Sequence, residues 1–402
     1  MIDSPILPGI VRKNDRKIVM VVLGGIGSAP DPVLGRTALE AARVPNLDHI
    51  ARQSSGGLVI PVAPGISPGS ATGNLALLGY DPLTYLFGRG ALEALGAGLA
   101  VEAGDIAVRG NLAMVDGKGV VTDRRADGIP TAAAAPLVEK LKTIKVKGVE
   151  VEVAQSAGHR FVLRLRGNGL SAEVTDTDPL EVGLPVITSS ATGTNGALTA
   201  TLINDFTAQA NALLSDEPVA NAVLLRGATG KPDLKSFNES YQLSAAGISS
   251  FPLHLGIAAA TGMAVYPVED TFAAHLAAVR EHWDEHDFFW IHYQEPTSTA
   301  GVGDFNEKRR ALEKVDVHVR ELLDLNPDVL VVAGDMANPT GHDGHSWHAV
   351  PFVIRSAGTL GDSGVERFNE RDLRAGSLGQ FEAKHAMMLT LAHAGKLRQF
   401  GA

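Results

Sequence analysis

Three short apolar runs lie far apart in the chain, and they limit the fold more than any other feature. They occupy residues 17–23 (KIVMVVL), 288–292 (FFWIH) and 329–333 (VLVVA). Unbroken apolar runs of this length are typical of strands in parallel sheets that are buried on both faces. Two segments with helical periodicity accompany these runs. Residues 37–53 follow the first run, and residues 307–325 lie between the second and the third. The pattern predicts one α/β layer domain built from both ends of the chain.

The middle of the chain has a different pattern. Residues 149–154 and 160–166 alternate apolar and charged side chains, as half-buried antiparallel strands do. We therefore expect a smaller, inserted α+β domain at 101–250. The segments 1–100 and 251–402 would then form the α/β core domain, a sheet flanked by helices.

Composition narrows the classes of function. The 402 residues carry a formal net charge of −10, and 5% are aromatic, which argues against a nucleic-acid-binding surface. No cysteine occurs, so disulfides and thiolate chemistry are excluded. No apolar run approaches the roughly 20 residues that span a bilayer, and the N-terminal segment is polar and interrupted by prolines, unlike a signal peptide. We expect a cytoplasmic protein that binds neither nucleic acid nor membrane.

Residues 64–80 (PGISPGSATGNLALLGY) contain the segment that most strongly indicates chemistry. Ser70 follows a Pro-Gly turn and precedes an apolar helical stretch, a position in which a hydroxyl can meet a phosphate at a helix N-terminus. The segment resembles the nucleophile segment of the archaeal-type cofactor-independent phosphoglycerate mutases, a branch of the alkaline phosphatase superfamily. That family's pattern is Pro-Gly-Ser-Asp-x-Ala-His-Leu. This chain keeps Ser70 and Leu75 but has Ala71 and Asn74 in place of the acid and the histidine.

The resemblance extends over nearly the whole chain. The family's motifs occur in order: PNLDHIA (45–51), LLGYDP (77–82), GRGALEALGAG (88–98), DRRA (123–126), HR (159–160), VTDTDP (174–179), LLRGA (224–228) and VLVVAGD (329–335). The resemblance implies an alkaline-phosphatase-like core and a smaller substrate-binding lid. It also implies two divalent metals, usually manganese, and a transiently phosphorylated serine, which together interconvert 3- and 2-phosphoglycerate.

The metal-ligand positions depart from the family. Followed motif by motif, four of the seven family ligands are replaced here, at Gly24, Thr297, Gly301 and Met336. Three are retained: Ser70, Asp335 and His345. Glycine and methionine offer nothing to a hard divalent cation, which prefers carboxylate oxygen and imidazole. We therefore expect none or one metal, and loss of the two-metal mutase reaction.

The substrate-binding side of the family pattern is retained. The resemblance assigns the ligand's carboxylate and phosphate to five basic positions: Arg124, Arg125, His159, Arg160 and Arg226. The planar guanidinium fork suits both anionic groups. A surface position would explain any one of these arginines, but the five together favour a retained pocket for a small anionic metabolite.

Histidines recur at 342, 345 and 348 in a glycine-flanked run. With Asp335 they suggest a relocated single-metal site, in which Asp335 and His345 are joined by His342 or His348. A polar loop with one inherited histidine is the alternative.

Two further patterns have simpler explanations. His292 and Glu295 suggest an acid–base pair, but such pairs are more often hydrogen-bonded strand ends. The glycine-rich turn at 24–27 follows a strand as a dinucleotide-binding loop does, but prolines stand where the helix should open.

Two classes of function remain open. The first is a repurposed enzyme that binds a small phosphorylated or carboxylated metabolite between core and lid, with Ser70 as its candidate catalytic residue. The second is a non-catalytic pseudoenzyme that acts as a ligand-binding protein, as a regulatory protein, or as a component of a complex with a protein partner. The retained basic positions favour a site that still binds its ligand, in either class.

Overall fold

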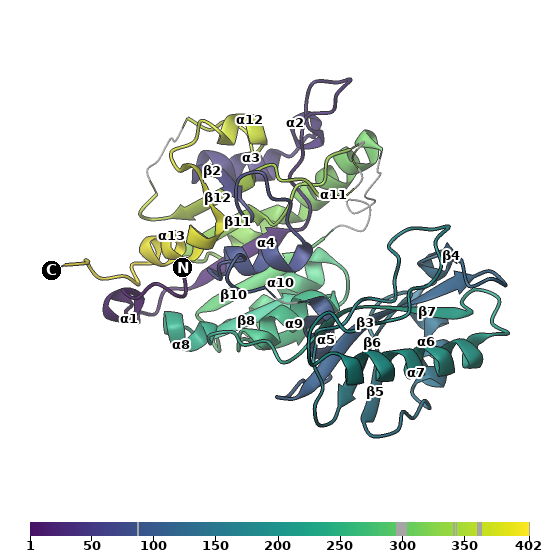
Figure 1. Ribbon diagram of the computed structural model, residues 1–402. Helices are drawn as coiled ribbons and strands as arrows, with labels where there is room; N and C mark the ends of the chain where they lie inside the picture. The colour runs from purple at the N-terminus through teal and green to yellow at the C-terminus, as the bar shows by residue number, and fades with distance from the viewer. Residues whose placement is uncertain (87, 295–303, 341, 343, 360–363, 402) are drawn as a thin grey trace. The chain divides into compact units, whose positions relative to one another are not determined.

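The computed structural model describes residues 1–402 except 87, 295–303, 341, 343, 360–363 and 402. The chain divides into two compact units (Figure 1). The first unit comprises residues 1–86, 235–250 and 261–402, and the second comprises 87–234 and 251–260. The second unit thus includes most of the insertion expected at 101–250, together with short segments on either side.

An eight-stranded sheet forms the centre of the first unit. Its order is β13 (Gly379–Glu382), β2 (Ser55–Ile60), β12 (Val350–Ser356), β11 (Val329–Gly334), β1 (Ile18–Leu23), β10 (Phe288–Tyr293), β8 (Ala245–Ser249) and β9 (Ala264–Pro267). Only β12 runs antiparallel to its neighbours. The three apolar runs of the sequence are therefore adjacent central strands, with β1 paired in parallel to both β10 and β11.

Burial on both faces explains the unbroken apolar character of these strands. Every residue of β1 is buried, because alternate side chains of a strand point to opposite faces and both faces are covered. One face packs against the apolar sides of four helices: α2 (Ala38–Ala41), α3 (Pro45–Arg52), α10 (Phe272–Glu281) and α11 (Phe305–Asp324). The first unit also contains five further helices: α1 (Leu7–Ile10), α4 (Ser70–Leu77), α8 (Phe237–Tyr241), α12 (Glu370–Leu373) and α13 (Ala386–His393). The expected α/β fold is confirmed.

The second unit is built on an antiparallel sheet. β3 (Asp105–Val115) pairs with β6 (Arg160–Arg166) and β4 (Val121–Asp123) and, separately, with β7 (Ala222–Thr229), while β5 (Glu150–Gln155) adds to β6. Alternation along the strands separates two faces. One face packs against α6 (Thr131–Leu141) and α7 (Ala197–Leu214), and the other against α5 (Arg89–Gly96).

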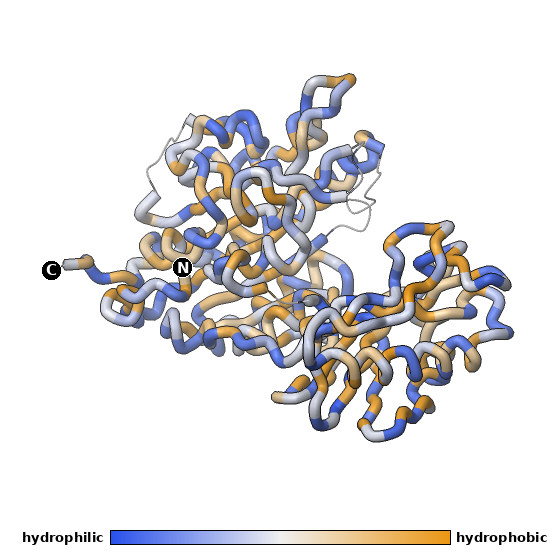
Figure 2. Tube along the Cα trace, in the orientation of Figure 1, coloured by the Kyte–Doolittle hydropathy of each residue, from blue (hydrophilic) through white to orange (hydrophobic). Residues whose placement is uncertain are grey.

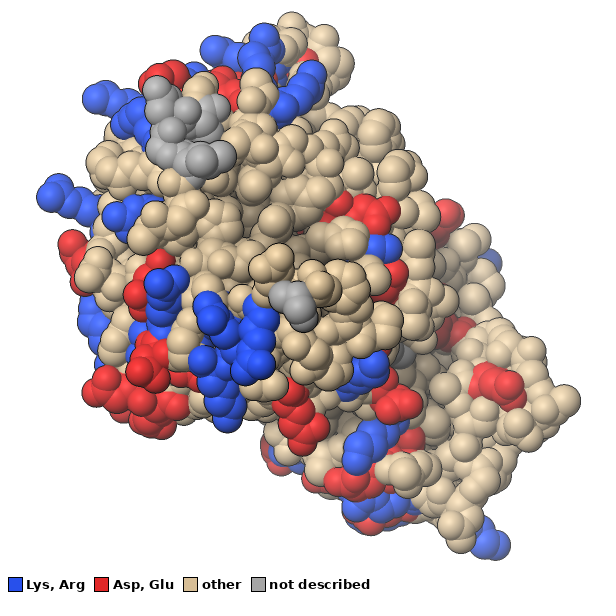
Figure 3. Space-filling model, turned by 90° about the vertical axis from the view of Figure 1, so that its left-hand side faces the viewer, with Lys and Arg blue, Asp and Glu red and all other residues tan. Residues whose placement is uncertain are grey.

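Figure 2 shows apolar residues concentrated in the interior of each unit and hydrophilic residues along its outer turns. Figure 3 shows basic and acidic side chains interspersed over one face of the surface. Within the described residues, no helix combines the length and the apolar character that a membrane crossing requires.

Glycines bring two helices of the second unit, α5 and α9 (Pro252–Ala260), into backbone contact. A Cβ atom at Gly256 would lie 1.7 Å from the carbonyl oxygen of Leu92, and one at Gly96 would lie 1.7 Å from that of Pro252. No side chain fits at such distances, so both positions require glycine. The contact fixes α9 against α5, the helix that also supplies charged residues to the basic cluster described below.

Replacement of Gly256 should therefore reveal this contact. We expect Gly256→Ala to lower the free energy of unfolding by about 1–3 kcal/mol, because the added methyl group forces two backbones apart. Urea denaturation measures the change. Gly117→Ala is the matched control in the same unit, since nothing lies within 4 Å of its Cβ position. Equal stability of the two variants would contradict the close contact.

Candidate functional site

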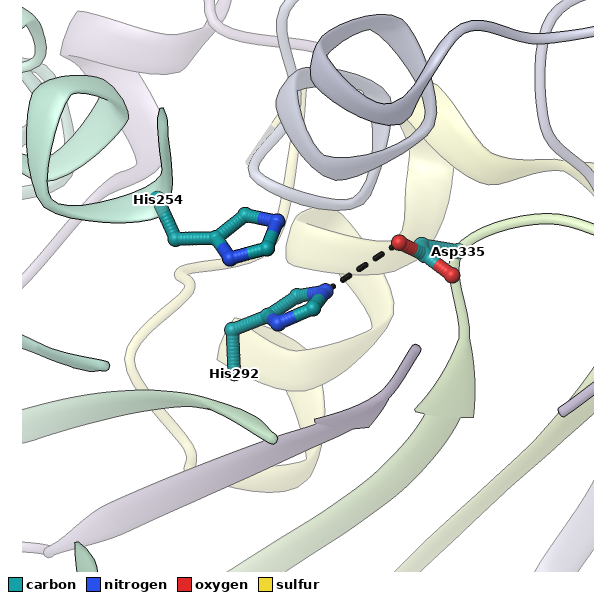
Figure 4. Close-up of side chains that lie close together, drawn as sticks. All are labelled: His254, His292 and Asp335. Atoms are coloured by element: carbon teal, nitrogen blue, oxygen red, sulfur yellow. Dashed lines mark hydrogen bonds and ion pairs between the residues drawn. The ribbon is translucent and has the colours of Figure 1, made fainter. Parts of the chain in front are cut away.

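Asp335 directly follows β11, at the carboxyl end of the central parallel strands, where α/β folds place their ligands. Its side chain is 1% exposed. Oδ1 accepts a hydrogen bond from the backbone N–H of Gly25 at 2.9 Å. Oδ2 accepts one from Nδ2 of Asn74 at 2.9 Å and lies 3.1 Å from Nε2 of His292, near the end of β10 (Figure 4). The carboxylate is thus bound by three protein groups.

The space beside Gly24, at the end of β1, is already filled. A Cβ atom at Gly24 would lie 2.9 Å from Cε1 of His292 and 3.0 Å from Cβ of Gln294. Gly25 adopts a φ of +65°, and a Cβ there would lie 2.5 Å from Nδ2 of Asn338. The turn after β1 is therefore closely surrounded by side chains, and glycine is required at Gly25 both by its backbone conformation and by the contact.

Ser70 is the first residue of α4 and is half-buried. Its carbonyl oxygen accepts a hydrogen bond from Nδ2 of Asn74 at 2.8 Å, so the fully buried Asn74 side chain joins the start of α4 to Asp335. Across the described residues, no carboxylate or imidazole hydrogen-bonds the Ser70 hydroxyl. The structure places Ser70 and Asp335 in one region through Asn74, but no described residue is hydrogen-bonded to the serine as a general base.

The predicted histidine run is arranged differently from the site around Asp335. His345 is exposed, and its Nδ1 bonds to Oδ1 of Asn338. His348 bonds through Nδ1 to Oγ of Ser346 at 2.9 Å, and His342 is exposed. Among the residues that the structure describes, no group of three histidine or carboxylate ligand atoms within 4.8 Å of one another includes any of these histidines.

The other predicted positions divide into two groups. Met336 is 2% exposed and belongs to the apolar interior. Thr297 and Gly301 lie outside the described residues, as does Glu295, the predicted partner of His292. His254, also drawn in Figure 4, belongs to α9 of the second unit.

Strand pairing in the second unit collects arginines from three strands on the face that packs against α5. Arg109 of β3 is paired in register with Arg226 of β7, and Asn111 of β3 with Arg160 of β6. Because alternate side chains of a strand point to the same face, these arginines lie on the face of Ala107 and Val162, which contact α5. The residues between them along each strand lie on the other face and pack against α6 and α7.

Two buried carboxylates, those of Glu93 and Asp178, contact this basic cluster, which we define as Arg89, Arg109, Arg160 and Arg226. Glu93 of α5 is completely buried and lies 3.0 Å from Nη2 of Arg89 and 3.6 Å from Nε of Arg109. The Nε atoms of Arg89, Arg109 and Arg160 are buried and hydrogen-bond to no described residue. The guanidinium of Arg160 lies over the ring of Phe251, 5.3 Å from its centroid. The cluster carries more positive than negative charge.

Burial and mutual repulsion change the proton affinities in this cluster. Burial, with a smaller contribution from the charges of neighbouring arginines, lowers the pKa of Arg109 to about 9, although Glu93 acts in the opposite direction. Burial also lowers the pKa values of Arg160 and Arg226. For His159, burial and then the charge of Arg160 lower the pKa to about 4, so its imidazole is neutral at pH 7.

The other predicted basic residues are placed differently. Arg124 forms a two-pronged pair with Asp178, Nε to Oδ1 at 2.9 Å and Nη2 to Oδ2 at 2.7 Å. Asp178 lies 3.7 Å from Nη1 of Arg226 as well. Burial opposes ionisation of Asp178, but the bonds from Arg124 hold its pKa below its usual range. Arg125 is exposed. Of the five predicted residues, His159, Arg160 and Arg226 belong to the cluster or adjoin it.

Comparison with known proteins supplies the family. A family model described as 2,3-bisphosphoglycerate-independent phosphoglycerate mutase matches residues 51–220. A protein of Thermus thermophilus named as a probable 2,3-bisphosphoglycerate-independent phosphoglycerate mutase is 42% identical over 403 residues, covering 99% of both chains. A protein of the same name from Deinococcus radiodurans is 42% identical over 402 residues, covering 98% of both. The chain belongs to the 2,3-bisphosphoglycerate-independent phosphoglycerate mutase family.

Solved structures of similar proteins agree with this family assignment. The cofactor-independent phosphoglycerate mutase from Thermoplasma acidophilum is 29% identical, with a TM-score of 0.66 over 94% of this chain and 100% of that one. The PH0037 protein from Pyrococcus horikoshii is 26% identical, with a TM-score of 0.81 over 97% and 100%. The mutase family that the motifs predicted is confirmed.

Sequence reasoning within the mutase family missed two features of this chain. One is the set of donors to Asp335, because His292 and Gly25 approach it only when β1, β10 and β11 become neighbours. The other is the pair of cluster residues Arg89 and Arg109, together with the carboxylate of Glu93 that contacts them. Period-two alternation along β3 places Arg109 on the opposite face from its apolar neighbours, and that was an available signal.

We expect Asn74→Ala to lower the free energy of unfolding by about 1–3 kcal/mol, because the buried Asp335 carboxylate loses a donor that water does not replace. Chemical denaturation measures the loss. Asn306→Ala is the matched control, since the side chain of this exposed asparagine makes no hydrogen bond to a described residue, and it should change stability by less than about 0.5 kcal/mol. An Asn74 variant as stable as the Asn306 variant would refute the role of the amide.

His159 should make the protein less stable in acid. Its pKa is about 4 in the folded state and about 6.5 in an unfolded chain, so between these values the unfolded state binds the extra proton. Stability therefore falls as the pH decreases from 6.5 toward 4, by about 2 kcal/mol at pH 5. The measurement is the difference between wild type and His159→Gln in denaturation at pH 5 and pH 7. His49→Gln, at an exposed histidine, should reproduce the wild-type dependence, and an unchanged pH dependence in His159→Gln would contradict the assignment.

Proposed function

We propose that this member of the mutase family binds a small phosphorylated or carboxylated metabolite at the basic cluster of its second unit and does not carry out the two-metal phosphoglycerate mutase reaction. One observation carries the second half of the proposal. The Asp335 carboxylate, a metal ligand by family resemblance, accepts hydrogen bonds from Gly25 and Asn74 and contacts His292.

The side chains around Asp335 fit a carboxylate bound by protein groups better than they fit a two-metal centre. A hard divalent cation needs several oxygen or imidazole ligands with free lone pairs. Gly24 supplies none, and an aspartate at that position would require the imidazole of His292 to shift, since a Cβ there would lie 2.9 Å from its Cε1 atom. Asn74 directs its Nδ2 donor, rather than a ligand atom, at Asp335. His345, a retained family position, bonds to Asn338 instead.

The basic cluster is suited to a small anion. Burial is the largest cause of the lowered pKa values of Arg109, Arg160 and Arg226, and the charges of neighbouring arginines add to it. A phosphate or carboxylate placed among them would offset the repulsion, and guanidinium forks pair with both groups in two-pronged geometry. The buried Nε atoms that lack hydrogen bonds to described residues would gain acceptors. Phosphoglycerate, which the relatives' names specify, has both groups.

Catalysis and sensing are the two candidate roles, and each has one observation in its favour. A repurposed enzyme is favoured by the position of Ser70 at the start of α4, where the helix N-terminus attracts a phosphate. A non-catalytic role is favoured by the lack of a carboxylate or imidazole partner for its hydroxyl among the described residues, since an unassisted serine is a poor nucleophile.

Calorimetric titration with 3-phosphoglycerate in the presence of a chelator tests the proposal. We expect saturable binding without metal, and Arg160→Ala should weaken it by at least about tenfold, because truncation of one partner of a buried charge-assisted contact costs about 2–5 kcal/mol. Lys118→Ala, an exposed basic residue of the same unit, should bind as the wild type does. Manganese should leave both binding and mutase turnover unchanged. Manganese-dependent turnover would overturn the loss of the reaction, and absence of binding to any phospho-acid would overturn the anion site.

A further inference from the structure

We propose that a cavity in the first unit binds a small planar aromatic molecule that carries an anionic group. The cavity has a volume of about 560 Å³ and lies between the loop after β1, helix α2, helix α12 and the segment before β12. In Figure 1, α12, α2 and β2 occupy the same part of the first unit. The cavity uses neither the Asp335 network nor the basic cluster, so this inference goes beyond the proposed function.

An aromatic side chain forms one wall of the cavity. Trp347 is 51% exposed, although large aromatic side chains normally bury most of their surface. Its ring stacks on that of His348, with the centroids 4.4 Å apart and the planes at 13°. His348 is fixed in turn by its bond to Ser346. A ring held flat on one side and open on the other is suited to stacking with a second planar group. Apolar contact is available from Leu58 and Ala349.

The acidic residues that line the cavity are already paired. Glu370 accepts hydrogen bonds from the backbone N–H of Ser28 at 3.0 Å and from Oγ1 of Thr37 at 2.7 Å. The charge of buried Lys308 also acts on this carboxyl and opposes the rise in pKa that burial causes. Glu40 accepts the N–H of Thr37 at 2.7 Å in a capping box at the start of α2, and its other oxygen pairs with Arg371 at 2.5 Å.

One basic residue is left to meet a ligand. Arg374 follows α12, lines the cavity and is exposed. Among the described residues, its guanidinium makes no ion pair or hydrogen bond, whereas that of Arg371 is engaged by Glu40. Glu40 is balanced by Arg371 and Glu370 by the nearby charge of Lys308, so the charge of Arg374 is left over at the cavity. Its guanidinium donors form a fork that matches phosphate or carboxylate.

These features specify a ligand by its chemistry. A planar ring stacks on Trp347, and an anionic group binds Arg374, in a space of the size that small-molecule ligands occupy. A nucleoside monophosphate and an aromatic carboxylate share this chemistry. Adenosine 5′-monophosphate and nicotinate are therefore the two probes, while adenosine and inorganic phosphate each supply only half of the recognition.

Tryptophan fluorescence gives a direct readout, because the chain has three tryptophans. Trp290 is completely buried, and Trp283 stacks on Phe289 at 5.6 Å. We expect at least one of the two probes to quench the emission saturably, and adenosine and phosphate to bind at least about tenfold more weakly. Trp347→Phe should remove the quenching. Trp347→Ala and Arg374→Ala should each weaken binding by about tenfold or more in calorimetry.

Two further variants locate the effect. Arg310→Ala, at an exposed arginine of α11, should leave binding of the quenching probe unchanged, and Arg160→Ala, in the basic cluster, should leave the quenching of Trp347 unchanged. The proposal is overturned if neither probe binds at millimolar concentration, or if binding survives both Trp347→Ala and Arg374→Ala. Equal affinity for adenosine and its monophosphate would refute the anionic requirement. Loss of binding in Arg160→Ala would place the ligand at the basic cluster instead.

Discussion

The carboxylate of Asp335 is the group on which the arrangement of the first unit's loops depends. It is buried at the end of a central strand, and a buried carboxylate is costly unless donors surround it. Here the donors come from the turn after β1, from α4 and from the end of β10. Strand ends and a helix that are far apart in sequence are therefore held together by one charge. The backbone approach of α4 is equally close, since a Cβ at Gly73 would lie 2.1 Å from the carbonyl oxygen of Asp335.

The same use of buried charge recurs at a distance from this carboxylate. Helix α3 begins at Pro45 with no side-chain cap of its own, and Asp316 of α11 accepts the free N–H groups of Asn46 and Leu47 at 3.1 and 2.8 Å. Lys308, on the same helix, donates to the carbonyl oxygens of Gly27 and Asn338 at 2.8 and 2.7 Å. Each of these charges satisfies backbone groups that the turns leave unpaired, which is the condition under which burial of a charge is tolerated.

The sequence predicted the sheet well and the site only in part, for reasons that lie in particular residues. The strands β1, β10 and β11 follow from local apolar runs, which need no knowledge of the fold. The motif comparison predicts that Gly24 stands where the family has a metal ligand. The sequence does not predict that His292 fills the space beside Gly24, because this contact depends on the register of β1 against β10. Arg109 is likewise recognisable as part of the basic cluster only once β3 lies between β6 and β7.

The network around Asp335 and the network around Glu93 are built from separate sets of residues. The bonds to Asp335 are made by residues of the first unit alone, and the ion pairs of Glu93, Arg89 and Arg109 by residues of the second alone. Substitutions at sites that share no partners act nearly additively. Under the proposal above, Asn74 stands where the family resemblance places a histidine, and it supplies a donor to the Asp335 carboxylate. A change at that position would leave the interactions within the basic cluster intact, so the proposed loss of the metal ligands requires no compensating change in the second unit.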